Sequence, residues 1–151
     1  ARRDWSDGVF RRLRRLAGHE LAISVLITAE LLGIQFYRAV MRSTGSRPLR
    51  AICSLFLQDE ALHVAYESGL LLALRARRGR WLGAVLSKTH LAFHVATALV
   101  VWSAHHRVLR AAGHTGWGFL RTCTQHYGLY LQPTRARFRA PRPPARARAR
   151  S

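Results

Sequence analysis

The stretch LQDEALHVAYESG, residues 57–69, gathers acidic side chains around one histidine. The chain has only 7 Asp and Glu residues among 151, and Asp59, Glu60 and Glu67 lie in this stretch beside His63. On a helix, Glu60 and His63 lie on one face about one turn apart, because their positions differ by three. A carboxylate and an imidazole so placed can bind one metal ion, or they can form a charge-assisted pair. The spacing therefore indicates a metal site or an ion pair on a helix.

A second carboxylate, Glu30, lies in the middle of an apolar segment, between Ala29 and Leu31. A buried carboxylate is costly unless it is protonated, paired or bound to a metal. Glu30 and Glu60 are equally far in sequence from Gly45, at the centre of the turn STGSRP. In a helical hairpin both carboxylates would therefore lie at the same level. Two carboxylates and a histidine at one level predict a metal site, although an arginine from another helix could also balance Glu30.

The elements that must position these residues are all helical. Apolar residues recur at three- and four-residue spacing, and no strand pattern competes. We expect a short amphipathic helix at residues 1–16, followed by an antiparallel, up-down four-helix bundle at residues 17–132. Residues 133–151 are rich in Arg and Pro, which predicts a disordered basic tail. Helix boundaries are expected at three residues: Pro48, Gly79 and Gly113.

The composition indicates a single basic domain. Hydrophobic residues make up 49% of the chain and supply a core, and the formal net charge is +18, with Lys88 as the only lysine. Such a surface, and the Arg-rich tail above all, is expected to attract acidic partners nonspecifically. No motif of specific nucleic-acid recognition occurs. The two cysteines, Cys53 and Cys123, are expected to be reduced and buried, which favours the cytoplasm.

One apolar segment has the length of a membrane span. Residues 21–40 are predominantly apolar, and a span needs about 20 such residues. Glu30 lies in the middle of the segment and Arg38 near its end. A bundle core explains the same pattern, so we expect no membrane insertion. A small polytopic membrane protein is the alternative.

The pattern of Glu30 with Tyr37 on one helix and Glu60-x-x-His63 on the next resembles the first half of the ferritin-like superfamily, which includes rubrerythrins and ferritins. LQDEALHVAYES is similar to the Asp-Glu-x-x-His segment of small bacterial ferritin-like proteins without an assigned function, and VVWSAHHRVLRAAG is similar to their third helix. The resemblance covers about residues 17–131. It implies a non-haem di-iron or di-manganese site, with Glu30 as a ligand, Glu60 bridging and His63 capping one metal. It also implies oxidation chemistry with O2 or peroxide.

The second half of the chain departs from that family pattern. No Asp or Glu follows Glu67, whereas the family supplies a further Glu on its third helix and a second Glu-x-x-His on its fourth. In this chain Cys123-x-x-His126 occupies the corresponding position. A complete two-metal site would therefore need other ligands.

The third expected helix offers histidines on one inward face: His90, His94 and His105. Counting from the turn near Gly79 places His94 opposite His63, which makes His94 the first candidate for an added ligand. His90 is the second candidate, and His105 lies nearer the level of Cys123. Each could equally be a hydrogen-bonded core histidine. Tyr37 could bond a metal ligand, but a core tyrosine is the favoured interpretation.

These observations predict a metal-binding ferritin-like protein. The expected cofactor is iron, as one ion or a pair, with manganese as the alternative, and the expected reaction is oxidation by O2 or peroxide of a small molecule. Glu60 and His63 could instead form a plain pair, and Glu67 could pair with His63 one turn on. The bundle would then be non-catalytic and would bind acidic partners. A homodimer is compatible with either function.

Overall fold

The computed structural model describes residues 18–131, which form four α-helices and no β-strand within that range. Helix α2 spans Gly18–Ser43, α3 spans Arg47–Ala76, α4 spans Arg80–Ala111 and α5 spans Gly116–Leu131. The prediction of an all-α fold with four helices in this region is confirmed. The predicted N-terminal helix at residues 1–16 and the predicted basic tail at residues 133–151 lie outside the described residues.

The helices begin and end for local reasons that the sequence contains. The Ser46 side chain caps α3 by accepting a hydrogen bond from the backbone N–H of Leu49 at 3.4 Å, and Pro48 lies in the first turn. Gly113 follows α4 with φ at 88°, a left-handed conformation that glycine adopts without a steric penalty. Its N–H donates to the carbonyl of Arg110 at 2.9 Å, which closes the helix end.

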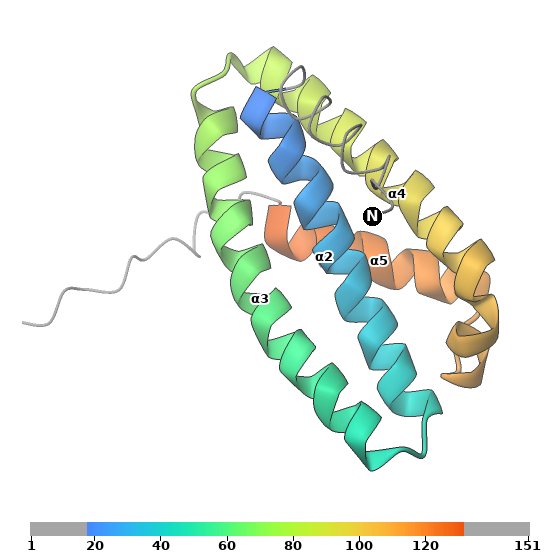
Figure 1. The fold of residues 1–151 in the computed structure, drawn as a ribbon. Helices are drawn as coiled ribbons and strands as arrows, with labels where there is room; N and C mark the ends of the chain where they lie inside the picture. Colours follow the sequence, from blue (N-terminus) through green and yellow to red (C-terminus); the bar gives the residue numbers. More distant parts are fainter. Residues whose placement is uncertain (1–17, 132–151) are drawn as a thin grey trace, which may run out of the picture.

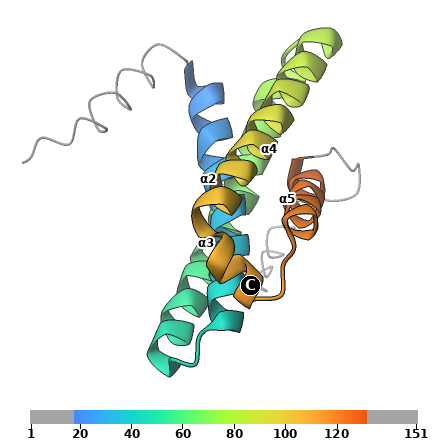
Figure 2. The ribbon, with the colours of Figure 1, turned by 90° about the vertical axis from the view of Figure 1, so that its right-hand side faces the viewer.

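Helix α2 lies between α3 and α4 (Figure 1). Helices α2 and α3 lie side by side and run in opposite directions, joined by the short turn at residues 44–46. Helix α4 packs mainly against α2 and α5 and has little direct contact with α3. Helix α5 stands on one side of the other three helices (Figure 2). The interface between α2 and α3 is therefore the most extensive of the fold.

The core has two clusters, and α2 contributes to both. The first joins α2, α3 and α5 and consists of Ile27, Leu31, Ile34, Val64, Leu71, Tyr127 and Leu131. The second joins α2, α4 and α5 and consists of Leu32, Ala39, Ala98, Leu109, Phe119 and Cys123. Adjacent residues of α2 thus enter different clusters, because α2 is covered on two sides.

Several large apolar side chains of α4 lie outside these clusters. They include Val85, Leu91, Phe93, Leu99 and Val100, all exposed. By length and composition alone, α2 and α4 are apolar enough to cross a membrane, a test that the core helix of a soluble protein also passes. Helix α4 therefore presents an apolar surface that the described residues leave uncovered.

Candidate metal centre

The interface between α2 and α3 holds Glu30 in a sheltered position. Ile27 and Ile34, one turn to either side on the same face of α2, are both buried. Glu30 therefore points into the interface, and its side chain is only 13% exposed. A carboxylate in this position loses most of its hydration and needs a compensating partner.

Helix α3 brings Glu60 and His63 to the same place. Glu30, Glu60 and His63 each offer one ligand atom, and these atoms lie within 4.8 Å of one another. Within residues 18–131 this is the one such group of three or more His, Cys, Asp or Glu side chains. The expectation that Glu30 and Glu60 lie at one level is thus met, because the turn between their helices is centred on Gly45.

The cluster opens to solvent on the side of His63. The His63 side chain is 64% exposed, and its Nδ1 lies 3.7 Å from Oε1 of Glu30. Among the described residues His63 is the basic partner within ion-pair distance of Glu30, so the expected alternative of an arginine partner is not found. His63 thus lies at the surface end of the cluster, and Glu30 lies at its sheltered end.

Glu67 is a further member of this neighbourhood that was not among the expected ligands. It lies one turn beyond His63, on the face of α3 that Glu60 and His63 share. With both groups ionised, Oε2 of Glu30 and Oε2 of Glu67 are buried and have no hydrogen-bond partner among the described residues. The sequence could have indicated Glu67 as a member of the cluster, because the spacing of positions 60, 63 and 67 places all three residues on one helix face.

Burial raises the pKa of two carboxyl groups in this cluster, Glu30 and Glu67. Burial, followed by the charges of Glu67 and Glu60, raises the pKa of Glu30 from 4.5 to about 7. Burial also raises the pKa of Glu67, although a hydrogen bond with Glu30 and the charge of His63 lower it in part. At neutral pH without a cation, a proton held by Glu30 can therefore bridge the two groups. A divalent cation would compete with that proton for the same oxygens.

His94 does not join this cluster, contrary to its predicted position opposite His63. It is fully buried, and its Nε2 lies 3.3 Å from the carbonyl oxygen of Cys123 on α5. The physical reason is that α3 and α4 meet only slightly, near the turn at Gly79, and α2 lies between them farther along, so matching of levels across that turn does not bring His94 to His63. Burial lowers the pKa of His94, which keeps it neutral.

His90 also lies apart from the cluster, in a hydrogen-bonded core position. Its Nδ1 accepts a hydrogen bond from Nη2 of Arg75 at 3.2 Å, so its Nε2 carries the proton and donates to Oγ1 of Thr28 at 3.1 Å. Both ring nitrogens are therefore engaged. Burial and the charge of Arg75 lower the pKa of His90 to about 4.

Cys123 and His126 do not form a second half-site. Cys123 is buried in the second core cluster, and burial raises the pKa of its thiol to about 12. Nε2 of His126 lies 3.5 Å from Nη1 of Arg38, and burial together with this arginine lowers its pKa. A protonated thiol and a histidine beside an arginine are poor metal ligands.

The two remaining candidates make aromatic contacts. Tyr37 stacks on Phe56 with ring centroids 5.1 Å apart. Tyr37 lies two helical turns nearer the interhelical turn than Glu30, and Phe56 lies one helical turn nearer it than Glu60. His105 was predicted on the inward face of its helix, and this is wrong: the residue is exposed, and its ring lies 4.8 Å from that of Phe36. Both contacts support packing roles, which was the favoured interpretation for Tyr37.

Comparison of the chain with known protein families, with curated proteins and with solved structures finds no match. The resemblance to the ferritin-like superfamily therefore stays a prediction based on the residues around Glu30, Glu60 and His63.

Proposed function

We propose that the chain binds one divalent metal ion through Glu30, Glu60 and His63. The single observation that carries the proposal is the meeting of their ligand atoms within 4.8 Å at the interface of two helices. Two carboxylates and an imidazole suit iron, manganese or zinc, and the charge of a divalent cation offsets the repulsion among the acids.

An ion pair alone explains the cluster less well. Charge-assisted hydrogen bonds are about 2.7–2.9 Å long, whereas His63 and Glu30 are 3.7 Å apart. A single protonated histidine would also leave two of the three carboxylates Glu30, Glu60 and Glu67 uncompensated. A divalent cation bound by Glu30, Glu60 and His63 balances the charges of both carboxylate ligands.

The chemistry of the proposed site follows from its ligands and its exposure. A bound iron ion would supply one-electron chemistry toward O2 or peroxide. Glu30 and Glu60 neutralise the cation, and His63 completes the ligand set. Glu67 lies beside Glu30, and its charge helps to raise the pKa of Glu30, so metal binding near neutral pH must displace the proton that Glu30 holds. The exposed side of His63 gives a small oxidant access.

This function fits a ferritin-like protein that keeps the first metal half-site and has lost the second. In that proposal the helices form the antiparallel bundle of the family, and the protein acts in the cytoplasm. Two copies of the chain associate through the exposed face of α4 to form a homodimer. The proposed reaction is oxidation by O2 or peroxide, with iron preferred and manganese as the alternative.

Metal analysis of protein purified without chelators tests the proposal. We expect about one iron or manganese ion per chain, and its loss in Glu60→Gln. Asp59→Asn is the matched control, because Asp59 is the exposed neighbour of Glu60 on the same helix and lies outside the cluster. Equal metal content in both variants would refute the proposed ligands.

A second candidate is a membrane protein, which the exposed apolar surface of α4 favours. Washing membranes with alkaline carbonate distinguishes a membrane protein from the proposed soluble metal-binding protein. Retention of the chain in the membrane pellet would support this candidate, and release as a soluble monomer or dimer would exclude it.

A further inference from the structure

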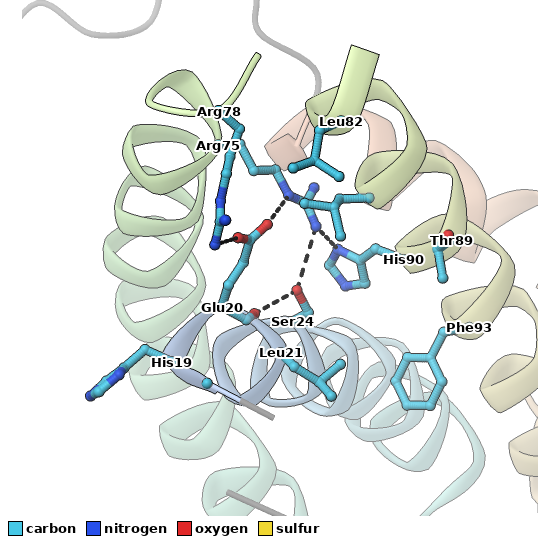
Figure 3. Close-up of a pocket in the computed structure, with 12 residues that line it drawn as sticks. His19, Glu20, Leu21, Ser24, Arg75, Arg78, Leu82, Thr89, His90 and Phe93 are labelled. Atoms are coloured by element: carbon cyan, nitrogen blue, oxygen red, sulfur yellow. Dashed lines mark hydrogen bonds and ion pairs between the residues drawn. The ribbon is translucent and has the colours of Figure 1, made fainter. Parts of the chain in front are cut away.

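A second polar group lies where α2 begins and α3 ends, around a cavity of about 430 Å³ (Figure 3). Small-molecule sites commonly have volumes of about 300–1,000 Å³. Arg75 reaches into this region from the end of α3, and Arg78 follows it in the connection to α4. The Glu20 carboxylate lies between them from the first turn of α2. None of these residues belongs to the proposed metal centre.

Arg75 is a buried cation, with its side chain only 7% exposed. It contacts Oε1 of Glu20 at 3.4 Å and the hydroxyl oxygens of Ser24 at 3.4 Å and Ser87 at 3.3 Å. It also donates to Nδ1 of His90 at 3.2 Å. Charge-assisted hydrogen bonds in good geometry are about 2.7–2.9 Å long. The guanidinium is thus surrounded by acceptors but held loosely by all of them.

Glu20 is shared between the two arginines. Its Oε1 lies 3.4 Å from Nε of Arg75, and its Oε2 lies 3.3 Å from Nη2 of Arg78. One carboxylate therefore balances two guanidinium groups. His90 adds no charge, because burial and Arg75 hold its pKa far below neutral. The polar end of the cavity carries a net charge of one positive unit and complements one anionic group.

The remaining wall of the cavity is apolar and accessible. Leu21 from α2 and Leu82, Leu86 and Phe93 from α4 line it. Leu21, Leu82 and Phe93 are 49%, 39% and 42% exposed, so a ligand that covered them would remove apolar surface from water. In Figure 3 Leu21 and Phe93 lie on the far side of the cavity from Arg78. The cavity thus has a cationic end and an apolar end.

We propose that this cavity binds a small carboxylate with an unbranched apolar chain, such as a medium-chain fatty acid. The carboxylate contacts Arg78 and the edge of Arg75, and the chain lies against Leu21, Leu82 and Phe93. A quaternary ammonium headgroup would meet two arginines, and an alcohol would leave the net positive charge unbalanced. Charge complementarity therefore selects a monoanion among ligands with the same tail.

Calorimetric titration of the full chain with decanoate tests this inference. We expect saturable binding at one site, and binding at least about tenfold weaker for 1-decanol and for decyltrimethylammonium, which have the same tail length. Comparable affinity for decanoate and 1-decanol would overturn the proposed role of the arginines.

Two variants locate the site. Arg78→Gln removes a half-exposed cation from the cavity and is expected to weaken decanoate binding about tenfold. Arg121→Gln is the matched control, because Arg121 is an exposed arginine of α5 that does not line the cavity, and it should bind as the wild type does. Thr89→Trp places a large side chain at the exposed cavity wall and should abolish binding. Unchanged affinity in both Arg78→Gln and Thr89→Trp would refute the site.

The outcome is independent of the proposed metal centre. Arg78 and Thr89 lie outside the Glu30 cluster, so manganese binding by both variants should match the wild type. Circular dichroism shows that each variant is folded, whether or not the chain binds manganese. Loss of decanoate binding with an unchanged circular dichroism spectrum is the result that supports the proposal.

Discussion

Nδ1 of His63 on α3 lies 3.7 Å from Oε1 of Glu30 on α2, across the largest interface of the fold. This separation is too long for a strong hydrogen bond between the two groups. Two ligands that share a metal at about 2.0–2.2 Å lie about 3–3.5 Å apart. A movement of a few tenths of an ångström would therefore bring this pair to the geometry of a shared ion.

The pH dependence of metal affinity is the first prediction. The pKa of Glu30 is raised to about 7. Below pH 7 a metal ion must therefore displace the proton of Glu30, whereas well above pH 7 Glu30 is already ionised and no proton has to leave. We expect manganese affinity to rise between pH 6 and pH 8. Calorimetry in two buffers of different ionisation enthalpy should show proton release at pH 6 that decreases by pH 8. Binding that is independent of pH over this range would argue against Glu30 as a ligand.

Glu30→Gln should separate stability from metal binding. The folded protein holds the Glu30 proton more tightly than the unfolded chain, so ionisation of Glu30 opposes folding as pH rises from 4.5 to 7. Without metal, we expect the variant to be more stable than the wild type at pH 8, by about 1–3 kcal/mol. At pH 4.5 the difference should be small.

Urea denaturation of metal-free protein at both pH values measures this difference. Comparing the variant with the wild type at each pH cancels the titration of groups that do not interact with Glu30, such as His90. The same variant should lose the stabilisation that manganese gives the wild type. A variant less stable than the wild type at pH 8 without metal would contradict the raised pKa of Glu30.

His94→Gln tests the expectation that His94 is an added ligand. The structure places this ring against the carbonyl of Cys123 and not in the metal cluster. We expect manganese affinity within about twofold of the wild type and a loss of about 1–2 kcal/mol in unfolding free energy from disturbed core packing. Loss of metal at retained fold, checked by circular dichroism, would restore His94 as a ligand.

Cys123 should be unreactive in the folded protein. Burial raises the pKa of its thiol to about 12, and the thiolate is the reactive form. In a Cys53→Ser background, iodoacetamide at pH 8 should leave Cys123 unmodified until urea is added, as read by mass spectrometry. Rapid alkylation of the native protein, or protection that appears only with metal, would mean that the thiol is an accessible ligand.

Local sequence signals accounted for the helices and for the meeting of Glu30, Glu60 and His63. Turn residues such as Gly113 fix helix ends through backbone conformation, which depends on near neighbours alone. Glu30 and Glu60 could be brought together by counting, because a short turn between two paired helices leaves little freedom in their register. Glu67 was visible in the same stretch, but its effect on the pKa of Glu30 needed the packed interface.

The rest was decided by which helices touch. Counting across the second turn predicted His94 beside His63, and it was wrong because α2 lies between α3 and α4. At the cavity, Arg75 of α3 likewise contacts Glu20 of α2 and His90 of α4. Sequence spacing within one helix could not predict these contacts. The sequence by itself determined the helices and the level of the acidic cluster, through backbone preferences and short turns. Only the tertiary structure decided the partners of α4, because that choice depends on packing among side chains far apart in the chain.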